Sequence, residues 1–266
     1  MSNLINSRLD LPTGSMNYIR FGDGAKNLVI IPGVEDGLKS LKASALSYPM
    51  FYRPLMQDFT VWVFSRRDNL PEGMTTREMA EDLNLAMNAL DLTQAAVMGI
   101  SLGGMIAQWL AIDHPEHVRK LVLVVTASRA NETGRAVIGH WIEMAKQGDY
   151  QGIMLDTAER SYTPERFRKV ERALRILGDF GKPESLDRFM IQATSCLNHY
   201  TYDQLYRIQC PTLVIGGTDD RIATAAGSIN MAVRIPNCEL RMVEGLGHGL
   251  YEEEKDFLEW VRKFCA

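Results

Sequence analysis

Residues 95–104 read AAVMGISLGG, an apolar run that passes directly into a serine flanked by glycines. The unbroken apolar run 95–100 predicts a strand buried on both faces, and the apolar residues 102–112 predict a buried helix. The turn between them must be so tight that side chains on either side of the serine would clash. Glycine at positions 99 and 103 removes both clashes and leaves the Ser101 hydroxyl at the top of the sheet.

Working outward from this stretch, the chain alternates between strand and helix patterns. Further strands are predicted at 16–21, 28–31, 60–64, 121–126, 212–215 and 238–243. The sequence Thr75-Thr76-Arg77-Glu78 predicts a capping box that opens a helix to about Leu90, and a last helix is expected over about 252–264. This alternation predicts an α/β fold, with a mostly parallel central sheet and helices on both faces.

The alternation is interrupted once, because residues 129–207 contain only helical patterns. Thr163-Pro164 predicts a helix start, Gly178 its end, and Pro183 the start of another helix to about Leu197. We therefore expect residues 1–128 and 208–266 to form the sheet domain, with 129–207 inserted as a helical unit above it.

Composition excludes several classes of protein. The 266 residues are 46% hydrophobic and 23% charged, which is enough apolar material for a full core. With 29 basic and 33 acidic side chains, the formal net charge is −4, so neither nucleic acid nor an anionic membrane is an expected partner. No apolar run approaches the roughly 20 residues that span a bilayer.

Cysteine usage and the first residues favour a cytoplasmic protein. The four cysteines, at 196, 210, 238 and 265, include no Cys-x-x-Cys pair, so neither a disulfide framework nor a zinc site is expected. No phosphate-binding glycine motif is present, and we expect no metal and no cofactor. Residues 1–14 lack a secretory pattern. The expected partner is a small-molecule substrate, and assembly as a homodimer is left open.

A serine hydroxyl becomes a nucleophile only when a neighbouring base takes its proton, and that base is usually oriented by an acid. His248 is the best candidate base, because it follows the last predicted strand between two glycines. Packing or surface roles are expected for the other histidines, His114, His117, His140 and His199. The acid follows the strand 212–215, where Asp219 and Asp220 are adjacent and compete for the role.

With these motifs, the chain resembles the α/β-hydrolase superfamily over nearly its whole length, including the order of nucleophile, acid and histidine. The resemblance implies Asp220 as the acid and makes the insertion a cap. It also implies that Val34 and Leu102 supply the backbone amides of an oxyanion hole. Pro32 precedes Gly33 where the family usually has histidine.

The resemblance implies a serine hydrolase acting through an acyl-enzyme, and a carboxylesterase for small to medium, largely apolar acyl esters is the expected activity. Carbon–carbon bond hydrolases, lyases and small-molecule synthases of the superfamily share these residues, and a ligand-binding receptor or scaffold is a further alternative. Cap residues predicted to line the substrate pocket are Trp141, Met144 and Phe189.

Overall fold

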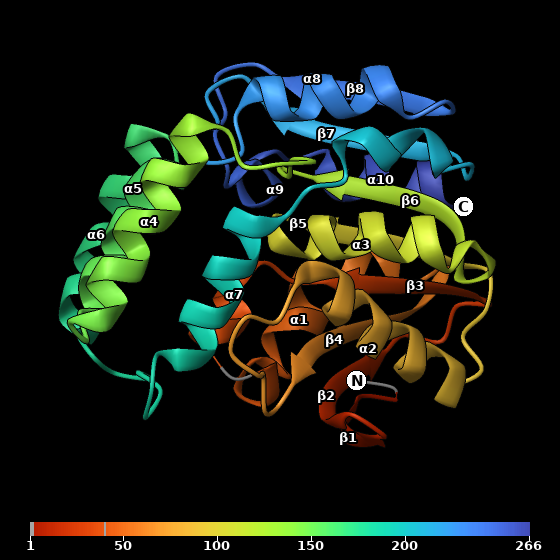
Figure 1. Ribbon diagram of the computed structural model, residues 1–266, viewed down its shortest axis with the longest axis horizontal. Coiled ribbons are helices and arrows are strands. Elements are labelled where there is room, and N and C mark those ends of the chain that lie inside the picture. Colours follow the sequence, from red (N-terminus) through yellow and green to blue (C-terminus); the bar gives the residue numbers. More distant parts are fainter. Residues whose placement is uncertain (1–2, 40) are drawn as a thin grey trace.

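A single twisted sheet forms the centre of the computed structural model, which describes residues 3–39 and 41–266 (Figure 1). Within these residues the strands are β1 (Ile5–Leu11), β2 (Gly14–Phe21), β3 (Lys26–Ile31), β4 (Phe59–Arg67), β5 (Ala95–Ile100), β6 (Val118–Val124), β7 (Thr212–Gly217) and β8 (Cys238–Val243). Their spatial order is β1-β2-β4-β3-β5-β6-β7-β8. The pairs β1–β2 and β2–β4 are antiparallel, and all other pairs are parallel. The predicted fold class is confirmed.

Each predicted strand has an observed counterpart, and β5 and β8 have the predicted bounds. Strand β6 ends at Val124 and not at Thr126, because Val125 takes a positive φ of 42° that an extended strand does not accommodate. Strand β1 was not predicted from the sequence; within the described residues it lies at the edge of the sheet and pairs with β2 alone.

Helices cover the sheet and extend beyond one of its ends. They are α1 (Ser47–Phe51), α2 (Thr76–Ala89), α3 (Leu102–Asp113), α4 (Glu132–Lys146), α5 (Tyr150–Ser161), α6 (Pro164–Leu177), α7 (Asp187–Asn198), α8 (Ala225–Arg234), α9 (Leu250–Glu253) and α10 (Phe257–Cys265). Short 3-10 helices are Val34–Gly37, Leu41–Ser44, Arg53–Leu55, Pro115–His117 and Tyr202–Arg207. None of the helices in the described ranges is long and apolar enough to cross a membrane.

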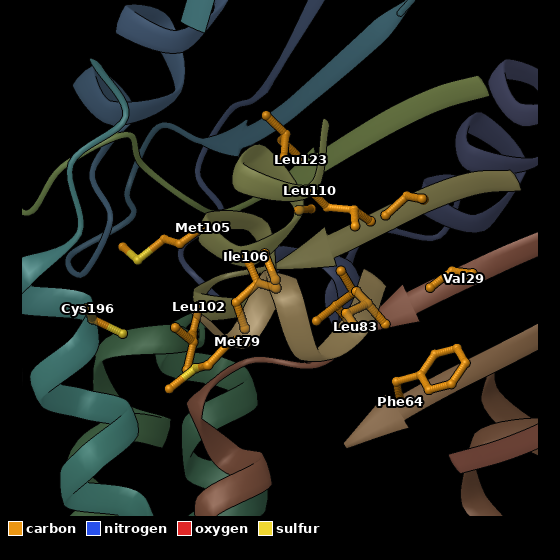
Figure 2. Packing of buried hydrophobic residues seen from close by; sticks show 14 of the residues in the cluster. Val29, Phe64, Met79, Leu83, Leu102, Met105, Ile106, Leu110, Leu123 and Cys196 are labelled. Atoms are coloured by element: carbon orange, nitrogen blue, oxygen red, sulfur yellow. The ribbon is translucent and has the colours of Figure 1, made fainter. Parts of the chain in front are cut away.

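Alternate residues of the buried strands supply two apolar cores, one on each face of the sheet. In β3, Val29 and Ile31 belong to one core, whereas Leu28 and Ile30 belong to the other. Figure 2 shows the first core, in which side chains of α2 and α3 pack over the strands: Met79, Leu83, Ile106 and Leu110. The second core includes Phe257 and Val261 of α10. Covered on both faces, the parallel strands hold their carboxyl ends in fixed positions.

Helices α4 to α7 occupy the segment between β6 and β7 and lie beyond the carboxyl ends of the parallel strands (Figure 1). The Thr163 side chain accepts from the Arg166 amide at the start of α6, and Gly178 ends that helix with a φ of 52°. Helix α7 begins at Asp187, after the predicted start at Pro183. The division into sheet domain and cap stays a prediction.

Candidate active site

Ser101 lies in a strained turn between β5 and α3. Its φ of 52° and ψ of −120° are rarely adopted by residues other than glycine. A Cβ at Gly99 would lie 2.3 Å from the Gly103 carbonyl oxygen, and one at Gly103 would lie 1.9 Å from the Ile31 carbonyl oxygen. The backbone therefore requires glycine two residues before and two residues after Ser101, as the sequence predicts.

His248 and Asp220 complete a hydrogen-bonded chain with Ser101. His248 Nε2 lies 3.0 Å from Ser101 Oγ, and His248 Nδ1 lies 2.9 Å from Asp220 Oδ2. The amides of Ile222 and Ala223 donate to Asp220 Oδ1 at 2.8 and 3.0 Å, which holds the carboxylate in place. The three side chains come from loops that follow β5, β7 and β8, so the parallel sheet brings them to one edge.

The two adjacent aspartates have different surroundings. Burial raises the pKa of Asp220, but the His248 interaction and the two backbone donors outweigh burial, and the pKa lies below its usual 3.8. Asp220 is therefore ionised at neutral pH beside the imidazole. Asp219 is exposed, accepts from the Thr218 hydroxyl at 3.0 Å and donates its amide to the Leu246 carbonyl. The structure brings Asp220, and not Asp219, to the histidine.

Two backbone amides next to Ser101 have no acceptor within the described residues. At the start of α3, the Gly104 and Met105 amides donate to the Ser101 carbonyl at 2.9 and 3.2 Å. The Leu102 amide has no such partner because it opens the helix, and the Val34 amide likewise opens a 3-10 helix after β3. These two donors are available for an oxygen atom of a ligand.

Two cavities open on the Ser101 hydroxyl and on His248. One is small, at about 30 Å³, and the other has a volume of about 290 Å³. Trp141 lines both cavities, and Phe189 lines the larger. Nine of the nineteen residues that line the larger cavity come from the segment between β6 and β7, and most of these nine are apolar.

Met144, the third predicted pocket residue, lines neither cavity. Its methyl carbon lies only 2.4 Å from the position that a Cβ of Gly152 would take, so Met144 packs between α4 and α5. Four lining residues of α5 and α6 were not predicted, although their four-residue spacing marks one helix face: Met154, Ala158, Val170 and Leu174. Nor were Glu35, Tyr251 and Glu252, which come from separate segments of the chain.

His199 lies outside this site. It is buried, with Nδ1 2.8 Å from Thr76 Oγ1 and Nε2 3.2 Å from Thr201 Oγ1. This is the packing role expected from the sequence.

Comparison with known proteins identifies the family. The curated relative RutD of Caulobacter sp. (strain K31), named for carbamate hydrolysis, is 30% identical over 217 residues, which span 73% of this chain and 76% of the relative. The 3-oxoadipate enol-lactonase 2 of Acinetobacter baylyi is 26% identical over 170 residues, or 63% of this chain and 62% of that protein. The curated relatives are matched over half to about three quarters of their own lengths.

Solved structures show the same fold over nearly the whole chain. The enol-lactonase of Burkholderia xenovorans LB400 has a TM-score of 0.82 at 20% identity, covering 97% of this chain and 99% of that one. The curated relatives described above support hydrolase activity for the chain. The family model described as alpha/beta hydrolase fold matches residues 27–255, and the chain therefore belongs to the alpha/beta hydrolase fold family.

Proposed function

We propose that this protein is a serine hydrolase that cleaves small to medium, largely apolar esters through an acyl-enzyme on Ser101. The observation that carries the proposal is the chain of hydrogen bonds from Asp220 through His248 to Ser101 Oγ, at 2.9 and 3.0 Å. A base within hydrogen-bond distance of a serine, itself oriented by a carboxylate, is the arrangement that activates a hydroxyl as a nucleophile.

The proposed reaction starts when His248 Nε2 takes the proton of Ser101 as Oγ attacks the ester carbonyl carbon. The Val34 and Leu102 amides donate to the oxyanion that forms, which stabilises the transition state. His248 then gives its proton to the leaving alcohol, and the acyl group remains on Ser101. Water, deprotonated by His248, releases the acid and restores the serine.

In this mechanism Asp220 orients the imidazole without taking its proton. Asp220 accepts from His248 Nδ1–H, which leaves Nε2 as the basic nitrogen facing Ser101. The lowered pKa of Asp220 keeps its charge in place when the imidazolium forms.

The substrate class is inferred from the cavity walls and the relatives. Trp141 and Phe189 present apolar surface to the larger cavity, which suits an apolar acyl or alcohol group. An enol-lactonase among the relatives supports ester-bond chemistry. We further propose that the segment 129–207 acts as a cap that encloses the substrate and sets its preferred chain length.

A fluorophosphonate probe tests the nucleophile. We expect one mass equivalent of probe on the peptide that contains Ser101, and no labelling of Ser101→Ala. Ester turnover by Ser101→Ala should fall by about 10⁴- to 10⁶-fold. Ser161→Ala is the matched control, because Ser161 lines the same cavity, and it should be labelled like the unmodified protein.

Persistent labelling of the Ser101→Ala variant would overturn the assignment of the nucleophile. Labelling of Ser101 without turnover of any ester would instead favour a lyase, a synthase or a ligand-binding protein built on the same site.

A further inference from the structure

A third cavity adjoins the larger of the two cavities at Ser101. Its volume is about 280 Å³, and its lining includes two carboxylates and three tyrosines: Glu35, Glu252, Tyr48, Tyr52 and Tyr251. We call these five residues the tyrosine–glutamate chamber. Tyr48 and Tyr52 stack with ring centroids 6.0 Å apart, and Phe51, also in the lining, meets Tyr52 edge-on at 4.8 Å. The chamber is therefore a partly open pocket that combines aromatic rings with two carboxylates.

The chamber adjoins the reaction centre. Glu35, Tyr251 and Glu252 line both it and the larger Ser101 cavity. A Cβ at Gly33 would lie 2.4 Å from Glu35 Oε2 and 3.3 Å from Ser101 Cβ, so the carboxylate and the serine flank the same glycine. A substrate bound at Ser101 can thus extend one of its ends into the chamber.

The polar groups of the chamber lack protein partners. No described acceptor lies within hydrogen-bond distance of the hydroxyls of Tyr48, Tyr52 and Tyr251, although the Tyr52 side chain is buried at 3% exposure. The Gly33 amide donates to Glu35 Oε1 at 3.0 Å, but Glu35 forms no ion pair with a described basic side chain. Tyr52 is buried, Tyr48 and Tyr251 are half-buried and Glu35 is exposed, so their polar atoms are open to a ligand that enters the cavity.

Charge decides which ligand fits. Burial raises the pKa of Glu35, and Glu35 in turn is the strongest charged influence on the pKa of each of the three tyrosines, which it raises. Glu252 is already paired, with Tyr162 at 2.9 Å and Arg166 at 3.4 Å. Glu35 is exposed to the cavity and forms no ion pair with a described basic side chain.

Two basic residues near Glu35 do not neutralise it. The Arg66 guanidinium lowers the pKa of Glu35 from a distance, but its Nη2 donates to the carbonyls of Pro32 and Gly33. Lys39 lines both cavities and is exposed, and it pairs with no described carboxylate.

We propose that the tyrosine–glutamate chamber binds an organic cation, an alkylammonium group carried by the substrate of Ser101. Aromatic faces attract such a cation through their quadrupoles, and Glu35 supplies the opposite charge. An anionic group would be repelled by Glu35, and a neutral alkyl group would leave the carboxylate without a counter-ion. The inference rests on the proposed function, since it assigns a substrate class to the same site.

Matched esters test the chamber. The first pair is butyrylcholine and its neutral analogue, in which a tert-butyl group replaces trimethylammonium in the alcohol part. The second pair consists of two nitrophenyl esters that carry the same two groups in the acyl part. At least one cationic ester should have a kcat/KM about tenfold above that of its neutral analogue. The pair that shows the preference identifies which end of the ester enters the chamber.

Variants show which residues cause the preference. For each variant, kcat/KM of the cationic ester is divided by kcat/KM of its neutral analogue, so that a general change in rate does not affect the comparison. Glu35→Gln keeps the acceptor for the Gly33 amide but removes the charge, and Tyr52→Leu removes an aromatic ring; both should bring the ratio toward one. Tyr52→Phe keeps the ring and should keep most of the preference. Glu244→Gln, an exposed carboxylate beyond β8, is the control and should leave the ratio unchanged.

Binding of choline to Ser101→Ala, measured by calorimetry, separates this inference from the proposed function. Binding that Glu35→Gln weakens would support the chamber even if no ester is hydrolysed. Neutral esters that are hydrolysed as fast as cationic ones, in both pairs, would overturn the cation site while leaving the serine hydrolase in place. Absence of choline binding together with equal rates would do the same.

Discussion

Arg188 of α7 forms an ion pair with Asp36, its Nη2 lying 2.8 Å from Asp36 Oδ2. The Asp36 side chain is only 2% exposed and also accepts from Ser65 Oγ and the Arg66 amide. Arg188 further donates to the carbonyls of Arg66, Arg67 and Asp68 at the end of β4. One side chain from the inserted helices thus fastens them to the loop after β3, two residues beyond the Val34 amide.

Replacing Arg188 should destabilise the protein more than any surface charge. Burial opposes ionisation of Asp36, but Arg66 and Arg188 outweigh it and lower its pKa, so Arg188→Met leaves a buried charge with one of its two partners. We expect a loss of about 3 kcal/mol in the free energy of unfolding, measured by urea titration. Arg175→Met removes an exposed pair with Glu171 on α6 and should cost less than about 0.5 kcal/mol. Equal losses in the two variants would contradict a fastening role.

Stability should fall as the pH drops below neutrality, because His199 is buried. Burial lowers the pKa of His199 to about 3, from 6.5 in the unfolded chain. Below pH 6.5 the unfolded state therefore binds a proton that the folded state does not bind. The free energy of unfolding is highest above pH 6.5 and decreases as the pH falls toward 3. Between pH 7 and 5 the loss should be about 2 kcal/mol, seen as a lower midpoint in urea.

His199→Gln should be less stable at pH 7 but should lose the part of the pH dependence that comes from this residue. His140→Gln replaces an exposed histidine of α4 and should keep the full slope between pH 7 and 5. A slope unchanged in His199→Gln would assign the pH dependence to another group.

Much of the fold follows from local patterns, and the exceptions have local causes. The strands β3, β5 and β7 are buried on both faces, so their sequences are unbroken apolar runs that are easy to recognise. Strand β1 is an edge strand of exposed and half-buried residues, INSRLDL, which carries no such run. The predicted last helix divides into α9 and α10 because residues 254–256 leave the helical path, a break that its continuous amphipathic pattern does not reveal.

Some residues of the candidate site could likewise be predicted from the sequence, and others could not. Ser101 could be located from sequence because its turn restricts the flanking residues to glycine, a steric demand that is visible in one short stretch. Glu35 and Tyr52 could not, since their meeting in one cavity depends on how the segment after β3 folds back over the sheet. Met144 and Trp141 lie on the same helix, and helical spacing alone did not separate the side chain facing the cavity from its neighbour.

The two adjacent aspartates offer a matched test of the proposed mechanism. Asp220→Asn keeps the shape of the side chain but removes the charge that orients His248, and should lower kcat by about 10⁴-fold. Asp219→Asn changes an exposed side chain and should leave kcat nearly unchanged, with a stability cost of at most about 1 kcal/mol. Both variants are assayed on one ester alongside thermal melting. A near-normal Asp220→Asn would remove the acid from the proposed triad.

Trp141 and Met144 offer the corresponding test of the proposed cap. Trp141 lines both cavities at Ser101, and its Nε1 donates to Asp156 Oδ2 at 2.6 Å, which fixes the ring. Trp141→Ala enlarges the cavity, so the ratio of kcat/KM between long and short acyl esters should shift by about 1–3 kcal/mol. Met144→Ala removes an apolar side chain of the same helix that packs against Gly152 outside the cavities. It should lower the melting temperature without changing the ratio. If both variants lose stability and neither changes chain-length preference, these helices only pack on the sheet and do not select the substrate.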